Sequence, residues 1–499
     1  MDRYFNTDHL QESLKTRALR GGAITIATQA TSFVLTLGST AILARLLTPT
    51  DYGLIAMITV VLGFMAVFKD FGLSMATIQR AEVTQSQVST LFWLNAAVGL
   101  TLMVLSAALA PRLAWFYEEP RLVSLTVFLS TAFLISGLGV QHQALLRRQM
   151  QFVPLAAIEI TGLGTGIALA IVAASRGAQY WALAIMTVST AAVSTMGFWL
   201  VCRWRPSLPD RRADIGSMVA FGRDLAGFNV LNYMARNVDQ VLIGRVWGGG
   251  ELGNYERASR LLQMPIKLIS TPISHVAIPT LCRLQHDPRR YRDYYLKALK
   301  PLAFVIMPGM AFITVMASDL IAVLMGDQWG QAGAIFAVLG VLGLLFPVSN
   351  TLGWHYIASG ETNRMLRWGI IDGAVVVAAV VLGVPYGALG VAAAFTAARI
   401  VLFLPGIWYA TRTVPVEVSD ILRTIRIPLL SSIVMGALLY FIRRALLVEF
   451  HIWPRLLTAI PAAVVAYLTI ACLASRSLSP LYDLPRLFVS VFRTREPSE

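Results

Sequence analysis

Fourteen long apolar stretches run through this amino-acid sequence, and each is long enough to cross a lipid bilayer. A spanning helix needs about 20 mostly apolar residues. Only helices and closed barrels satisfy their backbone hydrogen bonds in lipid. The stretches are continuous rather than alternating, so they predict an all-α polytopic membrane protein. The expected spans are residues 21–46, 52–68, 88–110, 122–146, 152–175, 178–201, 218–246, 251–280, 294–325, 331–358, 363–384, 388–411, 424–442 and 456–474.

The composition excludes an ordinary soluble domain. Of the 499 residues, 56% are hydrophobic and only 14% are charged, whereas soluble domains carry about 25% charged residues. Residues 1–20 are polar, and the first apolar run is too long for the core of a signal peptide. We therefore expect the N-terminus to be retained.

The formal net charge of +14 indicates membrane topology rather than nucleic-acid binding. If the N-terminus lies inside, most Lys and Arg residues fall at inner span ends and loops, including the clusters within 147–148, 203–212 and 283–292. This positive-inside bias predicts that both termini are cytoplasmic. Attraction to anionic membrane lipid is a secondary effect of the same charges.

Three cysteines, Cys202, Cys282 and Cys472, lie near the cytoplasmic side in this topology. That compartment is reducing, and the six histidines are scattered without metal-ligand spacing. We therefore expect no disulfide and no metal site.

The chain repeats a segment at an offset of 200 residues, so that residues 42–53 match residues 242–253. Six expected spans separate the copies, and because six is even, both copies point the same way across the membrane. Two lobes related by an axis along the membrane normal are typical of transporters with parallel repeats. The matching positions are Arg45 with Arg245, Asp51 with Glu251 and Gly53 with Gly253.

The repeat predicts the domain organisation. We expect two pseudo-symmetric six-helix lobes around a central cavity, followed by two further helices. The expected boundaries are 1–20 for a cytoplasmic N-terminal segment, 21–206 for the first lobe, 207–412 for the second lobe, 413–475 for the last two spans and 476–499 for a cytoplasmic tail.

Charged side chains inside the spans are the candidates for function, since each costs about 2.5–3.5 kcal/mol to insert and usually faces a cavity or a partner. The basic ones are Arg45, Arg223, Arg236, Arg245, Arg257, Arg260, Lys267 and Arg399. In the span 251–280, one helical face carries Glu256, Arg260, Gln263, Lys267, Ser270 and Ser274. A cavity lined by such a face suits an anionic cargo, and phosphate is the natural partner of arginine.

A purely structural role for these charges is the alternative. Arg45 and Arg245 lie near outer span ends, where long side chains extend to the interface. The remaining charges could pair internally: Arg236 with Asp239, Glu256 with Arg260, and Arg399 with Asp372 or Glu159.

Several motifs together resemble a known family. They are the segments 44–53 (ARLLTPTDYG), 68–73 (FKDFGL) and 237–244 (NVDQVLIG), followed by Gly253-Asn254-Tyr255 and Pro272-Ile273. The sequence resembles the Wzx-type polysaccharide transporters of the MOP superfamily over nearly its whole length. This resemblance implies a MATE-like fold in which two lobes enclose a V-shaped cavity that opens alternately to each side. It also implies a bacterial inner-membrane flippase, not an enzyme, whose cargo is an oligosaccharide linked by pyrophosphate to a polyprenyl lipid.

Combining the resemblance with the charges gives a candidate site. The expected substrate-binding residues are Arg45, Arg236, Arg245, Arg257, Arg260, Lys267 and Arg399, and the expected ion-coupling residues are Glu159, Asp239 and Asp372. We expect no cofactor; protons, sodium or the membrane potential are the candidate driving forces. A polysaccharide polymerase and its co-polymerase are the candidate protein partners in exopolysaccharide, capsule or O-antigen (lipopolysaccharide) biosynthesis.

Two other functions stay open at this point. A MATE-like ion-coupled exporter of cationic small molecules would need a mainly acidic cavity, and the basic excess disfavours it. A membrane polymerase or ligase would usually present a large outer loop with catalytic residues, whereas the outer loops here are short. The glycine-rich segment 162–166 (GLGTG) lies inside a span without a preceding strand, so it predicts a helix-packing surface rather than a nucleotide loop.

Overall fold

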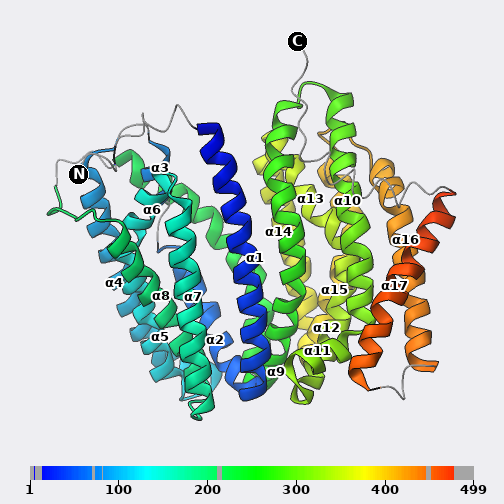
Figure 1. The fold of residues 1–499 in the computed structure, drawn as a ribbon, viewed down its shortest axis with the longest axis horizontal. Helices are drawn as coiled ribbons and strands as arrows, with labels where there is room; N and C mark the ends of the chain where they lie inside the picture. Colours follow the sequence, from blue (N-terminus) through cyan, green and yellow to red (C-terminus); the bar gives the residue numbers. More distant parts are fainter. Residues whose placement is uncertain are drawn as a thin grey trace. The chain divides into compact units, whose positions relative to one another are not determined.

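The computed structural model describes residues 5, 14–69, 73–80, 83–210, 216–445 and 451–476, with the backbone alone for residues 14–19, 73, 76, 79, 216–232 and 234–236. This described part divides into two compact units, Met1–Gly253 and Asn254–Glu499, which are treated one at a time below. Every regular element in it is a helix (Figure 1).

The first unit contains eight complete helices and the first part of a ninth. They are α1 (Leu14–Leu46), α2 (Pro49–Ala66), α3 (Leu73–Gln79), α4 (Gln85–Tyr117), α5 (Leu122–Gly137), α6 (Val140–Arg148), α7 (Phe152–Ser175), α8 (Trp181–Val201) and α9 (Gly216–Arg283). Helices α4 and α5 pack together, as do α7 and α8, and α1 packs on α7. The core of this unit includes the buried Phe92, Leu145 and Trp204.

The helix starts follow local sequence rules. Thr48 caps α2: the Asp51 carboxylate accepts a hydrogen bond from the Thr48 backbone N–H at 2.8 Å, and Pro49 occupies the first turn. Helix α9 breaks at Gly248, whose φ of 78° and ψ of −170° are not helical. This break lies between the expected spans 218–246 and 251–280, and a glycine permits the positive φ.

The second unit contains the rest of α9 and eight further α-helices. They are α10 (Pro288–Val315), α11 (Ala317–Met325), α12 (Gly330–Gly340), α13 (Leu342–Ser359), α14 (Thr362–Gly383), α15 (Gly387–Thr411), α16 (Val418–Ala445) and α17 (Ile452–Ser475), with short 3-10 turns at Asp327–Trp329 and Val384–Tyr386. Helix α10 packs on α13 and α16, α14 packs on α15, and α16 packs on α17. Its core includes the buried Phe304, Met435 and Tyr467.

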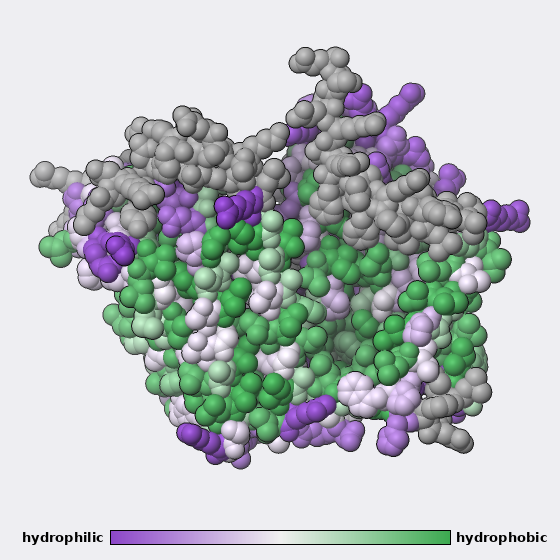
Figure 2. All heavy atoms as spheres, viewed as in Figure 1, coloured by the Kyte–Doolittle hydropathy of each residue, from purple (hydrophilic) through white to green (hydrophobic). Residues whose placement is uncertain are grey.

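The all-α polytopic fold is confirmed. Within the described residues, 10 helices are long and apolar enough to cross a membrane, or 11 if a pair bent by 52° (Asp327–Gly340 and Leu342–Ser359) is one span. Every expected span coincides with helical segments, but the total of fourteen crossings stays a prediction. On the visible face of each unit, hydrophobic side chains form a band, with hydrophilic side chains toward its ends (Figure 2).

Three expected spans are each divided between two helices. Residues 122–146 form α5 and α6, residues 294–325 form α10 and α11, and residues 331–358 form α12 and α13. Hydropathy averaged over the length of a span does not locate such breaks, since Leu122–Arg148, which contains the division between α5 and α6, still qualifies as one apolar span.

The glycine-rich segment of α7 packs against α8, as predicted. A Cβ on Gly162 would lie 2.1 Å from Ser194 Oγ, and one on Gly166 would lie 2.0 Å from Thr190 Oγ1. Such close contact requires residues without a side chain. No atom lies within 4 Å of a Cβ added to Gly164, so Gly164 is not part of the contact between α7 and α8.

The two repeated segments touch each other within the first unit. A Cβ on Gly53 would lie 1.7 Å from the carbonyl oxygen of Gly249, and one on Gly253 would lie 1.8 Å from the carbonyl oxygen of Pro49. Pro49 and Gly249 are themselves equivalent positions in the repeat. The contact between α2 and α9 is therefore reciprocal, and each copy presents its glycine to the other copy's first turn. The lobe boundaries at residues 206 and 412 are not tested by this contact and stay predictions.

Candidate substrate-binding site

The second unit holds a charged cluster in α9, just after the break at Gly248. The Glu256 carboxylate accepts a hydrogen bond from Arg257 at 2.8 Å and one from Arg260 at 3.2 Å. The ion pair predicted between Glu256 and Arg260 is confirmed, and Arg257 joins it. Two guanidinium groups share one carboxylate, so the cluster keeps a net positive charge.

The members of this cluster differ in their exposure. The Glu256 side chain is 15% exposed and that of Arg257 is 11% exposed, whereas that of Arg260 is 60% exposed. A guanidinium has five N–H donors, so Arg260 presents free donors on the exposed side. The next turns of the same face carry the exposed side chains of Gln263 and Lys267. Lys267 has no ion-pair partner among the described residues.

Of the two partners predicted for Arg399, Asp372 and Glu159, the structure shows Asp372. Arg399 Nη1 donates to both oxygens of Asp372 in α14, with a distance of 2.7 Å to Oδ2, and the Arg399 guanidinium lies 5.2 Å from the centre of the Phe395 ring. Glu159, the other alternative, lies 3.8 Å from Arg147 and accepts a long hydrogen bond from Gln143. Arg399 is therefore neutralised in this conformation.

In the first unit, Arg45 and Arg245 lie near helix ends, whereas Asp239 lies within α9. Arg245 pairs with Glu118 at 2.9 Å and lies 5.9 Å from the centre of the Phe116 ring. Arg45 is exposed in the last turn of α1. The Asp239 carboxylate accepts a hydrogen bond from the Gln240 backbone N–H at 2.8 Å.

The predicted site residues are divided between the two units. Arg257, Arg260, Lys267, Arg399 and Asp372 belong to the second unit, and the others belong to the first. The side chain of Arg236 lies outside the described residues, and so does its predicted pairing with Asp239. A single cavity lined by all of them stays a prediction.

A buried carboxylate in the second unit was not predicted. Asp319 in α11 is 4% exposed and binds Arg443 of α16 at 3.0 Å and Arg455 of α17 at 2.9 Å. These contacts tie the last two helices to the rest of the unit. Asp319 lies inside the expected span 294–325, and a carboxylate at such a position indicates a partner. Its two arginine partners lie outside the expected spans, where arginine is common, so the sequence did not single them out.

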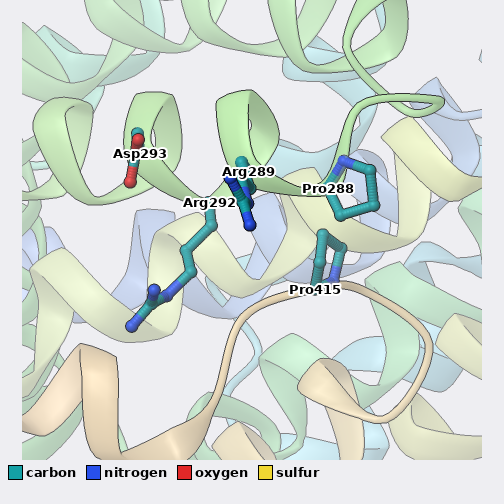
Figure 3. A pocket seen from close by; sticks show the side chains of 5 residues that line it. All are labelled: Pro288, Arg289, Arg292, Asp293 and Pro415. Atoms are coloured by element: carbon teal, nitrogen blue, oxygen red, sulfur yellow. The ribbon is translucent and has the colours of Figure 1, made fainter.

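A shallow pocket of about 320 Å³ lies at the start of α10, lined by Pro288, Arg289, Arg292, Asp293 and Pro415 (Figure 3). The Arg292 guanidinium points away from the two prolines (Figure 3) and donates to Asp420 of α16 at 2.7 Å. The pocket contains no predicted site residue, and the role of Arg292 is to join α10 to α16.

Comparison with known proteins identifies the family. Residues 42–334, more than half of the chain, match the family Polysacc_synt_3, described as polysaccharide biosynthesis protein. The chain belongs to this family. It is 28% identical over 383 residues to the teichuronic acid biosynthesis protein TuaB of Bacillus subtilis (strain 168), covering 76% of this chain and 79% of TuaB. It is 25% identical over 367 residues to the lipopolysaccharide biosynthesis protein WzxC of Escherichia coli (strain K12), covering 72% and 74% of the two chains.

The fold agrees with this assignment. The structure is similar to that of the lipid II flippase MurJ in an inward closed conformation, with a TM-score of 0.72 and 16% identity over 92% of this chain and 99% of MurJ. The predicted resemblance to Wzx-type transporters and the predicted fold class are both confirmed. At this identity the likeness shows the fold, and the cargo has to be argued from the residues of this chain.

Proposed function

We propose that this protein flips a polyprenyl-pyrophosphate-linked oligosaccharide from the cytoplasmic to the periplasmic face of the bacterial inner membrane, for exopolysaccharide, capsule or O-antigen biosynthesis. One observation supports this cargo above the others. Within a flippase-type fold, α9 carries two exposed cations, Arg260 and Lys267. Among the described residues, the one carboxylate that pairs with either of them is Glu256, which Arg257 and Arg260 share. A surplus of positive charge on a span face suits a pyrophosphate and repels a cationic drug.

In this proposal Arg260 and Lys267 bind the pyrophosphate, together with Arg236 and Arg257. The lobes 21–206 and 207–412 open alternately to each side. Arginine offers paired donors to the phosphate oxygens, and lysine adds a compact point charge. Arg399 contributes only when Asp372 releases it.

Glu159, Asp239 and Asp372 are the proposed ion-coupling residues. Protonation of Asp372 would remove the charge that holds Arg399, which links proton binding to the anion-binding capacity of the cavity. A charge that moves through 100 mV releases about 2.3 kcal/mol, enough to bias a two-state equilibrium. Sodium or the membrane potential would act through the same carboxylates.

The topology and the protein partners belong to the same proposal. Both termini lie in the cytoplasm, and the chain performs no catalysis itself. Once outside, the repeat units pass to a polysaccharide polymerase and its co-polymerase.

The test is a gene deletion followed by localisation of the lipid-linked repeat unit. A flippase deletion leaves the repeat unit on the cytoplasmic face and abolishes polymer. Repeat units that reach the outer face in the deletion strain would overturn the proposal and indicate a polymerisation defect instead.

Variants of the complementing gene test the residues. Arg260→Ala and Lys267→Ala should each reduce export. Arg290→Ala serves as the matched control, because Arg290 is an exposed arginine paired with Asp287 at 3.3 Å. Wild-type export in both α9 variants would refute the assignment of anion binding to α9.

A further inference from the structure

The start of α14 and the end of α15 carry a cluster of stacked aromatic and arginine side chains. The Trp368 and Tyr409 rings are stacked with their centres 5.4 Å apart. The Arg364 guanidinium lies 4.9 Å from the centre of the Tyr409 ring and donates to the Tyr409 carbonyl at 2.9 Å. These two helix ends are adjacent because α14 and α15 pack side by side as a helical hairpin.

Two further arginines lie at the same helix ends. The Arg412 guanidinium lies only 3.6 Å from the centre of the Trp408 ring. Arg367, one turn after Arg364, is exposed. Within the described part of the chain, none of the three arginines forms an ion pair with a carboxylate. At the start of α10, in contrast, Arg290 and Arg292 are both paired with aspartates, whereas Arg289 forms no ion pair among the described residues.

Aromatic stacking leaves the guanidinium edges available. A cation–π contact uses none of the N–H donors of an arginine, and of its five donors Arg364 gives one to the Tyr409 carbonyl. Arg364 and Arg412 are thus fixed in orientation without losing their charge. This is the arrangement that a phosphate-binding site needs, because bidentate phosphate contacts use those edges.

An apolar track leads along α15 to this charged cluster. Val401, Leu404 and Trp408 are 68%, 53% and 52% exposed, and they follow each other at helical spacing up to Arg412. An exposed apolar strip that ends at a cluster of cations matches an amphiphile with a long hydrocarbon chain and an anionic head.

A buried hydroxyl group lies beside the same cluster. Tyr356 of α13 is 4% exposed, and its hydroxyl has no hydrogen-bond partner among the described residues. Its carbonyl accepts a hydrogen bond from the backbone N–H of Glu361, the residue just before α14. Buried polar groups are rarely left without a partner. A phosphate oxygen held by Arg364 would supply one.

We propose that Arg364, Arg367 and Arg412 form a loading site for the pyrophosphate of a polyprenyl-linked substrate, whose hydrocarbon chain lies along Val401, Leu404 and Trp408. Three cations without a carboxylate match the two negative charges of a pyrophosphate diester better than the single charge of a phospholipid phosphodiester. In the predicted topology the loops after α13 and α15 are cytoplasmic, which is the side on which the cargo would be built. This site rests on the proposed function and adds a first binding step before the cavity.

The test is direct binding to the purified full-length protein in nanodiscs of phosphatidylcholine. Farnesyl pyrophosphate is the probe, and affinity is measured by thermophoresis, which does not depend on flipping. Arg367→Ala and Arg412→Ala should each weaken binding by roughly tenfold, as expected for the loss of a charged hydrogen bond. Arg412→Lys should retain part of the affinity, and Arg290→Ala should bind like the wild type.

Competition identifies the source of the phosphate. If nanodiscs that contain phosphatidylglycerol abolish binding of the probe, the site is a general phospholipid site and the cargo assignment is wrong. If the probe binds the arginine variants and the wild type equally, the site itself is wrong.

The binding experiment and the deletion experiment fail separately. Loss of probe binding in the variants, together with normal flipping in the deletion strain, would keep the site and refute the proposed function. Unchanged binding in the variants, together with a flipping defect in the deletion strain, would refute the loading site and keep the proposed function.

Discussion

The contact between the two repeated segments predicts a large effect from a single methyl group. In Gly53→Ala the new Cβ would lie 1.7 Å from the Gly249 carbonyl oxygen and 2.6 Å from the Gly249 Cα. The two helices would have to move apart by roughly 1.5–2 Å to reach ordinary van der Waals separation. The obstacle is backbone, which cannot rotate away as a flexible side chain can.

The expected loss of unfolding free energy in Gly53→Ala is the difference between two opposing effects. Overpacking of a close contact costs about 1–3 kcal/mol, and the upper end applies here because backbone atoms are in the way. Alanine recovers about 1 kcal/mol over glycine in a helix, which leaves a net loss of about 2 kcal/mol. For a body of roughly 250 residues, this lowers the thermal unfolding midpoint by roughly 4–8 °C.

The assay is thermal unfolding of purified variants in detergent. Gly22→Ala in α1 is the matched control, because no atom lies within 4 Å of its added Cβ, and it should be neutral or slightly stabilising. Gly253→Ala should match Gly53→Ala, since the contact is reciprocal. The double variant should cost less than the sum, because one helix separation relieves both clashes. A Gly53→Ala protein as stable as the Gly22→Ala protein would refute this reasoning.

Two further predictions concern the same contact and the last two helices. The double variant Thr50→Cys with Gly250→Cys, made in a protein whose three native cysteines are replaced by alanine, should form a disulfide under mild oxidation. The reason is that a Cβ added to Gly250 would lie 3.6 Å from Thr50 Oγ1. A gel shift after cleavage of the chain between the two positions detects the disulfide, and the single variants should show no shift. Asp319→Asn should destabilise the protein by about 3–5 kcal/mol, because it leaves two arginines around a buried uncharged group. Asp287→Asn loses only an exposed ion pair and should cost less than about 1 kcal/mol. Equal melting temperatures for the two variants would contradict the structural role of Asp319.

The fold could be predicted from the sequence because lipid leaves the backbone few choices. A run of about 20 apolar residues in a membrane has to be helical, so each expected span coincides with helix. The divisions inside residues 122–146 and 294–325 depend on tertiary packing instead. Hydropathy averaged over the length of a span does not locate them, since Leu122–Arg148 still qualifies as one apolar span.

The candidate site was predictable where partners are close along the chain. Glu256 and Arg260 are one helical turn apart, which is the spacing of a helical ion pair. The bond from Asp319 to Arg455 joins residues 136 positions apart, and no local rule finds it. The Arg364 and Arg412 cluster was hidden for another reason, since basic residues at inner span ends are normally explained by topology alone.

The repeat also changes the ranking of the predicted binding residues. Arg45 ends α1, where a cation stabilises the helix C-terminus, and Asp51 lies in the first turn of α2, where an acid stabilises the N-terminus. Their counterparts Arg245 and Glu251 flank the break of α9 at Gly248 in the same way.

Helix-end electrostatics are sufficient to account for the matched charges, and the reciprocal contact is sufficient to account for the matched glycines. Arg399 is neutralised by Asp372, and Arg257 offsets the charge of Glu256. Among the described side chains of α9, Arg260 is mostly exposed although it shares Glu256 with Arg257, and Lys267 has no ion-pair partner. We therefore propose that anion binding along this helix depends on Arg260 and Lys267 more than on Arg45 and Arg245, the arginines that made the repeat visible.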